Sequence, residues 1–172
     1  MQSISKIDVT RTYLEMRAPS ELQPAHSDDP SIRIEWQRNC SIELFRDLYR
    51  QVGKNYFWTD RLSWTDEQIN TYLQQPGVSL WLMTYDEDIA GYFELKRAPD
   101  SSTEIAYFGL MPQFIGRGLG KHLLTCAVER AWADGAKRVW LHTCTDDDPA
   151  ALPNYLKRGF KPCKTETYTV ER

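Results

Sequence analysis

The sequence predicts an α/β fold in which a mixed sheet is flanked by helices, built as a single domain over residues 1–172. Segments of alternating polar and apolar residues stand beside segments whose apolar residues recur at helical spacing. Residues 78–85 and 89–96 alternate on either side of a short acidic turn, which is typical of a β-hairpin. Residues 103–145 follow the order strand, glycine loop, helix, strand, which is the order of a βαβ crossover.

The same patterns predict each element along the chain. Alternation indicates strands, apolar residues at i, i+3 and i+4 indicate helices, and proline and glycine mark the connections. The predicted strands cover 8–16, 31–36, 78–85, 89–96, 103–111, 137–145 and 161–170, and the predicted helices cover 42–52, 66–74, a segment from Leu119 to the glycine at 135, and a short segment before residue 161.

Local signals set several helix ends. Thr65 and Gln68 form a capping box at the start of the second helix. The short helix before the last strand has Asp148 as a candidate N-cap, but Pro153 would interrupt a helix that started there. We expect that helix to be broken at Pro153 or to begin at it.

The composition excludes several classes of function. A net charge of −3 without a basic run argues against nucleic-acid binding, and no stretch approaches the length of a membrane span. The N-terminus lacks the apolar segment of a signal peptide, so we expect a cytoplasmic protein. The four cysteines form no C-x-x-C pair and His26 and His142 lack metal-ligand spacing, so we expect reduced thiols and no metal. Cys144 fits a buried structural thiol better than a nucleophile.

Residues 104–124 contain the chemistry that organises the chain. Gly116, Gly118 and Gly120 alternate directly before a helix. Glycine lets the backbone turn sharply and approach a ligand, and the first N–H groups of a helix have no partner within it. Those N–H groups lie at the positive end of the helix dipole, so the loop suits a phosphate or pyrophosphate.

Two nucleotide-binding motifs do not fit this loop. The dinucleotide pattern G-x-G-x-x-G needs a glycine where Lys121 stands, and no acidic ribose partner follows about twenty residues later. The triphosphate-binding loop needs a glycine at Ile115 and a serine or threonine at His122. His122 is expected on the solvent-facing side of the helix.

The remaining pattern, x-x-G-x-G before a helix, resembles the pantetheine-pyrophosphate loop of the GCN5-related N-acetyltransferases. Residues 151–160 resemble the second signature of that family, A-x-x-x-Y-x-x-x-G-F, and a helix and a strand separate the two signatures as in the family. The resemblance implies a mostly antiparallel central sheet, acetyl-CoA as the cofactor, and transfer of an acetyl group to an amine by direct attack in a ternary complex. Three residues before the first glycine of its G-x-G the family usually has glutamine or arginine; that position is Ile115 when counted from Gly118 and Gln113 when counted from Gly116.

The resemblance also implies which residues bind coenzyme A. Backbone N–H groups of the loop would hold the pyrophosphate, with added charge from two basic side chains, and the end of the preceding strand would follow the pantetheine. Asp148 stands where many family members have a cofactor-contacting asparagine. The implied cofactor-binding residues are Leu110, Met111, Pro112, Ile115, Gly116, Arg117, Gly118, Leu119, Gly120, Lys121, Asp148 and Tyr155.

Three residues are candidates for catalysis. By the resemblance, Glu104 is the general base, commonly acting through water, and Tyr155 protonates the leaving thiolate. Glu94, on the neighbouring predicted strand, is the second candidate base. The alternative for Tyr155 is a half-buried ring in the core.

The acceptor is an amine of a small molecule or of a protein. Glu94, Glu104 and Asp60 favour a cationic acceptor, while the aromatic residues of 55–64 either form the acceptor wall or pack two helices onto the sheet. A catalytically silent acyl-CoA sensor on the same fold is the alternative function. A homodimer and a monomer both remain open.

Overall fold

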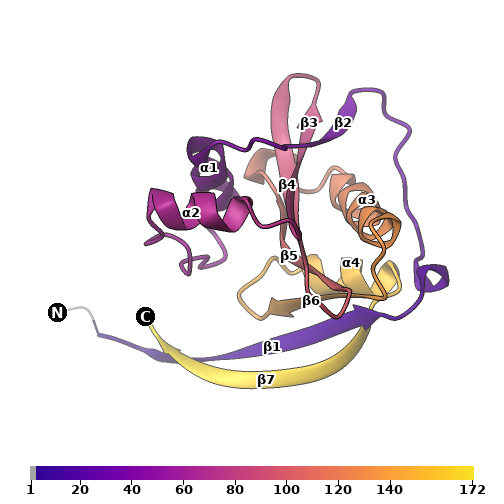
Figure 1. Cartoon of the computed structure of the whole chain (residues 1–172). Coiled ribbons are helices and arrows are strands. Elements are labelled where there is room, and N and C mark those ends of the chain that lie inside the picture. The colour runs from indigo at the N-terminus through magenta and orange to yellow at the C-terminus, as the bar shows by residue number, and fades with distance from the viewer. Residues whose placement is uncertain (1–2) are drawn as a thin grey trace.

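The computed structural model describes residues 3–172 and confirms the predicted order of helices and strands (Figure 1). Each predicted element is present, with its ends shifted by at most a few residues. The strands are β1 (Lys6–Met16), β2 (Ile32–Trp36), β3 (Val78–Tyr85), β4 (Asp88–Arg97), β5 (Ser102–Leu110), β6 (Arg138–Cys144) and β7 (Lys161–Glu171), and the helices are α1 (Ile42–Gly53), α2 (Asp66–Leu73), α3 (Leu119–Ala133) and α4 (Ala151–Lys157). Two single turns of 3-10 helix, Pro19–Glu21 and Pro112–Phe114, were not predicted.

All seven strands form one sheet in the order β2-β3-β4-β5-β6-β1-β7. The pair β5–β6 is parallel and the other five neighbouring pairs are antiparallel. The expectation of a mixed, mostly antiparallel sheet is therefore confirmed. The first strand of the chain lies between the last two, so the two ends of the chain run side by side as a long ribbon (Figure 1).

Helices cover both faces of the sheet, with α1 and α2 on one side and α3 and α4 on the other (Figure 1). Two adjacent residues of β5 show this division, because neighbouring side chains of a strand point to opposite faces. The ring of Tyr107 meets Tyr49 of α1 at 5.4 Å, while the ring of Phe108 meets Tyr155 of α4 at 6.1 Å. The central strands therefore have a buried layer on each face.

Side-chain caps begin the first two helices. The Ser41 hydroxyl accepts the backbone N–H of Leu44 at 3.0 Å at the start of α1. The predicted capping box is present at α2, where the Thr65 hydroxyl accepts the N–H of Gln68 and the Gln68 side chain accepts the N–H of Thr65. These bonds pair backbone donors that the helix itself cannot satisfy.

The expectation for the last helix was wrong. The helix α4 is neither broken at Pro153 nor begun by it, because it starts at Ala151 and contains Pro153 in its first turn. The missing N–H of proline costs nothing there, since the first N–H groups of a helix have no intrahelical partner. Asp148 does not cap the helix but accepts the N–H of Ala150 in the preceding turn.

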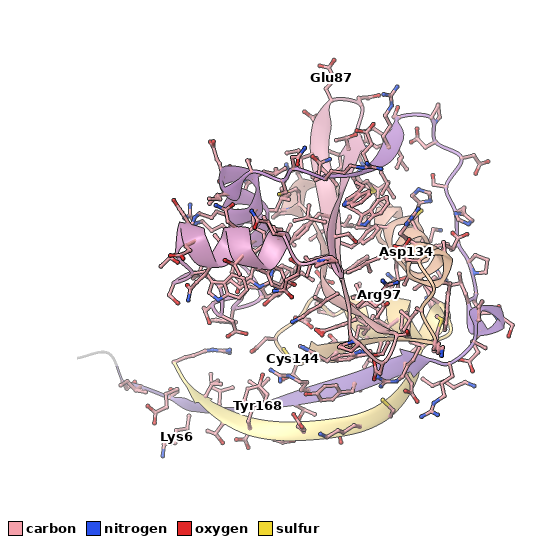
Figure 2. The ribbon with its side chains drawn as sticks, in the orientation of Figure 1. Lys6, Glu87, Arg97, Asp134, Cys144 and Tyr168 are labelled. Carbon is pink, nitrogen blue, oxygen red and sulfur yellow. The ribbon has the colours of Figure 1, made fainter. Side chains whose placement is uncertain are left out.

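The β3–β4 hairpin has the acidic tip that the sequence predicts. Asp86 adopts a left-handed conformation with φ of 54°, and Glu87 points away from the sheet (Figure 2). Within residues 3–172, no helix is long and apolar enough to cross a membrane.

Candidate active site

A cavity opens where β5 and β6 separate. These parallel strands pair over three positions, from Ser102 with Arg138 to Glu104 with Trp140. Beyond Glu104 they diverge, and residues of both line a cavity of about 750 Å³, including Ile105, Leu110 and Leu141. The facing edge of β5 thus leaves backbone groups unpaired inside the cavity, as a bound amide chain would require.

The glycine loop forms one end of this cavity. Gly116 and Gly118 have φ values of +82° and +77°, a region that favours glycine. A Cβ atom added at Gly116 would meet nothing within 4 Å, and one at Gly118 would meet only the Lys121 side chain at 3.7 Å. The open space beside the backbone is therefore a cradle, and α3 begins at it without a side-chain cap. Its N–H groups are free to bind an anion.

The residues predicted to bind the cofactor divide into two groups. Leu110, Ile115, Gly116, Gly118, Gly120, Lys121, Asp148 and Tyr155 line the cavity. Leu119 and Met111 are buried in the core instead, and Pro112 starts a 3-10 turn. The Arg117 guanidinium lies over the rings of Tyr85 and Phe114 at 4.7 and 5.0 Å, so its side chain is engaged outside the cavity.

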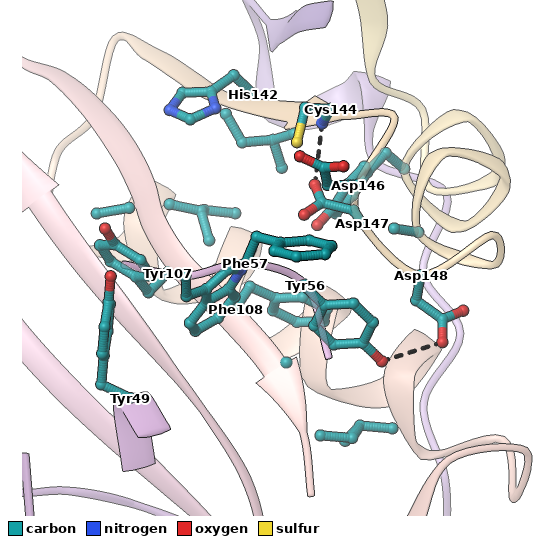
Figure 3. A pocket seen from close by; sticks show the side chains of 18 of the residues that line it. Tyr49, Tyr56, Phe57, Tyr107, Phe108, His142, Cys144, Asp146, Asp147 and Asp148 are labelled. Carbon is teal, nitrogen blue, oxygen red and sulfur yellow. Dashed lines mark hydrogen bonds between the residues drawn. The ribbon is translucent and has the colours of Figure 1, made fainter. Parts of the chain in front are cut away.

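Two polar contacts tie the cavity walls together. The Tyr56 hydroxyl donates a hydrogen bond of 3.1 Å to Asp148 Oδ2, across the cavity mouth (Figure 3). Burial and then the Asp148 carboxylate raise the pKa of Tyr56 to about 12. The Asn154 amide donates to the Gly120 carbonyl at 3.3 Å and so fixes α4 against the start of α3.

Tyr155 lies on the cavity wall with its ring in the core. The side chain is 6% exposed and packs edge-to-face against Phe108 and Phe160. Its hydroxyl has no hydrogen-bond partner in the described part of the chain, yet it is not sealed from solvent. Burial, followed by the charge of Asp147, raises the pKa of Tyr155, so the phenol keeps its proton at neutral pH. Tyr155 therefore packs in the core and also lines the cavity.

Glu104 lines the cavity at the point where the strands separate. Burial raises the pKa of its carboxyl group, and the nearby charge of Lys96 opposes this shift. No basic side chain among residues 3–172 lies within ion-pairing distance of it. A carboxylate with a raised pKa and no fixed partner is a stronger base than an ordinary glutamate and is suited to accept a proton.

Glu94 is placed differently. Its side chain is fully buried, does not line the cavity, and accepts a hydrogen bond of 2.9 Å from Arg61. Burial alone would lower the pKa of Arg61, but the Glu94 charge more than offsets it and raises that pKa. Arg61 itself lines the cavity, so Glu94 acts on the cavity through Arg61 rather than directly.

Residues 55–64 were interpreted either as a cavity wall or as packing between two helices, and each description fits part of the segment. Tyr56, Phe57 and Trp58 line the cavity, and Trp58 also contacts Tyr107 at 4.9 Å. Trp64, at the end of the segment, stacks on Phe45 of α1 and meets Tyr72 of α2. The first half of the segment is therefore a cavity wall, and its end holds the two helices together.

Two residues of the opposite wall were not predicted to line the site, and one of them, Cys144, is half-buried rather than buried. His142 and Cys144 alternate along β6 and both line the cavity (Figure 3). Burial and then Arg11 lower the pKa of His142, whereas burial and then Asp147 raise that of Cys144. The imidazole is therefore neutral and the thiol protonated at neutral pH. Their exposure on β6 follows from the divergence of β5, which no local pattern indicates.

A second group of titratable side chains lies outside the cavity. His122 is half-buried rather than solvent-facing, and its Nδ1 accepts the N–H of Ser27 at 2.9 Å. His26 and Cys126 lie close enough for the three to suggest a metal site. Accepting at Nδ1 leaves the proton of His122 on Nε2, the nitrogen that faces Cys126 at 3.7 Å, so that nitrogen has no free lone pair for a metal.

Sequence comparison identifies the family. The model of the acetyltransferase (GNAT) family matches residues 41–160, which include β3 to β6, the glycine loop and Tyr155. The chain belongs to this family. The match begins at the N-cap of α1, so β1 and β2 lie outside it.

Individual relatives agree with this assignment. A mycothiol acetyltransferase of Corynebacterium efficiens is 34% identical over 141 residues, which are 82% of this chain and 45% of that protein. An uncharacterized N-acetyltransferase of Mycobacterium bovis is 32% identical over 99 residues, covering 58% of this chain and 63% of that one. The chain thus spans less than two thirds of the length of these relatives.

Solved structures show the same fold. A GCN5-related N-acetyltransferase from Kribbella flavida superposes with a TM-score of 0.67 over 98% of this chain and 59% of that chain, at 19% identity. A Bacillus subtilis acetyltransferase in complex with CoA superposes with a TM-score of 0.58 over 76% of both chains, at 22% identity.

Proposed function

We propose that this GNAT protein transfers an acetyl group from acetyl-CoA to the amine of an acceptor by direct attack in a ternary complex. The observation that carries the proposal is the continuity of the cavity. Gly116, Gly118 and Gly120 of the glycine cradle, the open edge of β5, Glu104 and Tyr155 all line one space. The cradle suits a pyrophosphate because two positive-φ glycines leave room beside free N–H groups at a helix start.

Acetyl-CoA supplies the activated acetyl group as a thioester. Glu104 accepts a proton from the attacking amine, directly or through one water molecule. Free N–H groups along the edge of β5 stabilise negative charge that develops on the carbonyl oxygen. The protonated hydroxyl of Tyr155 gives its proton to the departing sulfur. The proton that leaves the amine is thus held by the base, and the proton on the free thiol comes from the tyrosine.

The order of substrate use tests this mechanism. Initial rates of CoA release should be measured while acetyl-CoA and an amine are varied together. Intersecting double-reciprocal lines are expected for direct attack, whereas parallel lines would indicate an acetylated protein intermediate, with Cys144 as the nucleophile in the cavity. Cys144→Ser should leave the intersecting pattern in place.

The same measurement distinguishes an enzyme from a silent acyl-CoA sensor. Amine-dependent release of CoA supports the transferase. Tight binding of acetyl-CoA without release against primary amines, amino sugars, polyamines and peptides would instead favour a sensor. Departures from the family pattern at Ile115 and Asp148 are the reason to include this outcome.

A further inference from the structure

Arg61 is held rigidly in the cavity wall by three kinds of contact. Its side chain is 9% exposed, and its Nη1 donates to Glu94 Oε1 at 2.9 Å. Its backbone N–H donates to the Tyr49 hydroxyl at 3.1 Å. Four aromatic rings surround the guanidinium, with centroids 4.2 to 5.4 Å from its central carbon: Phe45, Trp64, Tyr72 and Tyr107. The position of the charge is therefore fixed before any ligand binds.

The other nitrogens of this guanidinium are available to a ligand. Among residues 3–172, Glu94 is the one side chain that accepts a hydrogen bond from the Arg61 guanidinium. The unpartnered Nε and Nη2 atoms are not sealed in the protein, in contrast to the second oxygen of Glu94, which is buried without a partner. Arg61 lines the cavity, so donors that are not sealed in the protein are within reach of a ligand bound there. A guanidinium edge of this kind matches the two oxygens of a carboxylate.

A second cation lines the same cavity, near the Tyr72 ring that Arg61 also contacts. Lys96 lines the cavity, pairs with Glu104 in the register of β4 and β5, and lies 5.6 Å from the Tyr72 ring. Its ammonium group has no carboxylate within ion-pairing distance in the part of the chain that is described. Arg61 and Lys96 are balanced by Glu94 and Glu104 at rest. When Glu104 takes a proton from the amine, this part of the cavity carries one net positive charge.

Asp60 is the remaining acidic residue on this side of the cavity. It is solvent-exposed at the rim, where water screens its charge. The acidic groups expected to attract a cationic acceptor therefore contribute little: Glu94 is occupied by Arg61, and Asp60 is screened. Of these three acidic residues, Glu104 remains beside Arg61 and Lys96, while the other acidic residues that line the cavity, Asp146, Asp147 and Asp148, lie between β6 and α4.

We infer that the acceptor carries a carboxylate close to its amine, as an amino acid does, and that Arg61 selects it through its free guanidinium edge. The inference rests on the proposed acetyl transfer and names the substrate class of that same site. The carboxylate binds at Arg61 with support from Lys96, which leaves the amine beside Glu104. A zwitterionic acceptor then meets a group of opposite charge at each end.

Matched acceptors test the inference. The kcat/KM for each of several amino acids should be compared with that for its primary amide and for the amine that lacks the carboxyl group. A charge-assisted hydrogen bond predicts that the carboxylate improves kcat/KM by about 10- to 100-fold. Equal rates, or faster reaction of the amides and simple amines, would overturn the inference.

Arg61→Lys isolates the contribution of the guanidinium. Lysine keeps a positive charge beside the buried Glu94 but cannot donate two parallel hydrogen bonds to a carboxylate. The kcat/KM for an amino acid divided by that for its amide should therefore fall about tenfold. Arg130→Lys, an exposed substitution on α3, should leave the ratio unchanged. A ratio that survives Arg61→Lys would remove Arg61 from acceptor selection. Lys96→Met, which does not disturb the buried pair, provides a second variant and should lower the same ratio.

Direct binding keeps the inference testable if no amine is acetylated. Calorimetric titration of an N-acetyl amino acid and of its amide, each in the presence of CoA, compares the two without turnover. Preferential binding of the acid supports the carboxylate site even when the proposed acetyl transfer fails. Equal binding of the acid and the amide contradicts the carboxylate site, whatever the activity.

Discussion

The hydroxyl of Tyr56 and the carboxylate of Asp148 are joined by a 3.1 Å hydrogen bond, although the residues lie 92 positions apart in the chain (Figure 3). The bond links the segment that follows α1 to the turn that precedes α4. Both residues line the cavity, so this contact holds its two walls at a fixed separation.

Removing that bond should loosen the cavity around its ligand. Tyr56→Phe deletes one hydrogen bond to a charged group at a partly open site, a loss of about 1 kcal/mol. We expect CoA to bind about fivefold more weakly, mainly through faster dissociation, as measured by stopped-flow displacement. Tyr13→Phe is the matched control, because the Tyr13 hydroxyl donates to Glu166 at 3.2 Å outside the cavity. Equal effects of the two variants would contradict a role for Tyr56 in ligand retention.

Tyr155→Phe separates the two roles of that ring. Phenylalanine preserves the edge-to-face packing on Phe108 and Phe160 but removes the proton donor. We expect kcat to fall by about 10²-fold with little change in CoA affinity, in steady-state and calorimetric measurements. A fully active Tyr155→Phe protein that binds CoA normally would make Tyr155 a core residue only.

Glu104→Gln should change the pH dependence of the reaction. The base must be deprotonated to act, so the wild-type rate should fall as pH drops through the raised pKa of Glu104. Glutamine should lower the rate and remove that acidic limb, and the loss should be greater for more basic acceptor amines. The pH–rate profiles of kcat/KM test this with acceptors of different amine pKa. An unchanged acidic limb would assign the base to another group.

Glu104→Gln, which should lower the reaction rate, should make the folded protein more stable at neutral pH. Because the pKa of Glu104 is raised in the folded state, the folded protein binds more protons and loses stability as pH rises from the ordinary glutamate pKa through the raised one. Glu104→Gln should therefore increase the unfolding temperature at neutral pH, with the gain vanishing at low pH. Glu87→Gln, at the exposed hairpin tip, serves as the control in thermal unfolding.

The Arg61–Glu94 pair gives a separate stability prediction. Glu94→Ala leaves a nearly buried guanidinium without its carboxylate and should cost about 3 kcal/mol or more of unfolding free energy in urea titrations. The double variant Arg61→Met with Glu94→Leu should recover most of that loss, because neither charge then remains buried. Glu166→Ala, which breaks an exposed pair with Lys164, should cost less than about 1 kcal/mol. A cost for Glu94→Ala as small as that would contradict the burial of the pair.

Local signals predicted much of this structure, because they act over a few residues. The capping box of Thr65 and Gln68 fixes the start of α2, and the three alternating glycines predict a turn before α3. The distribution of charge in the cavity depends instead on residues that folding brings together. Arg61 and Glu94 meet across 33 positions, and no sequence pattern shows that this pairing withdraws Glu94 from the cavity.

The sequence does not indicate the position of β1 in the sheet either. Its alternating pattern predicts a strand but does not specify the partners, and the structure places it between β6 and β7. Arg11, which lies on β1 opposite Cys144 of β6, reaches the cavity only because of that placement. For α4 a local signal was misleading: Pro153 predicted a break or a helix start, whereas the helix holds this proline in its first turn.

The assignment of the cavity between β5 and β6 to coenzyme A is tested most directly by isothermal titration calorimetry. CoA should be titrated into the wild-type protein, Gly118→Trp and Gly135→Trp. Both glycines have positive φ and room for a Cβ atom, so both variants carry similar backbone strain of about 1–2 kcal/mol, but only Gly118 faces the cavity. We predict micromolar or tighter binding by the wild type and Gly135→Trp, and at least about 10²-fold weaker binding by Gly118→Trp. Unchanged binding by a folded Gly118→Trp protein, or no binding by the wild type, would contradict the assignment.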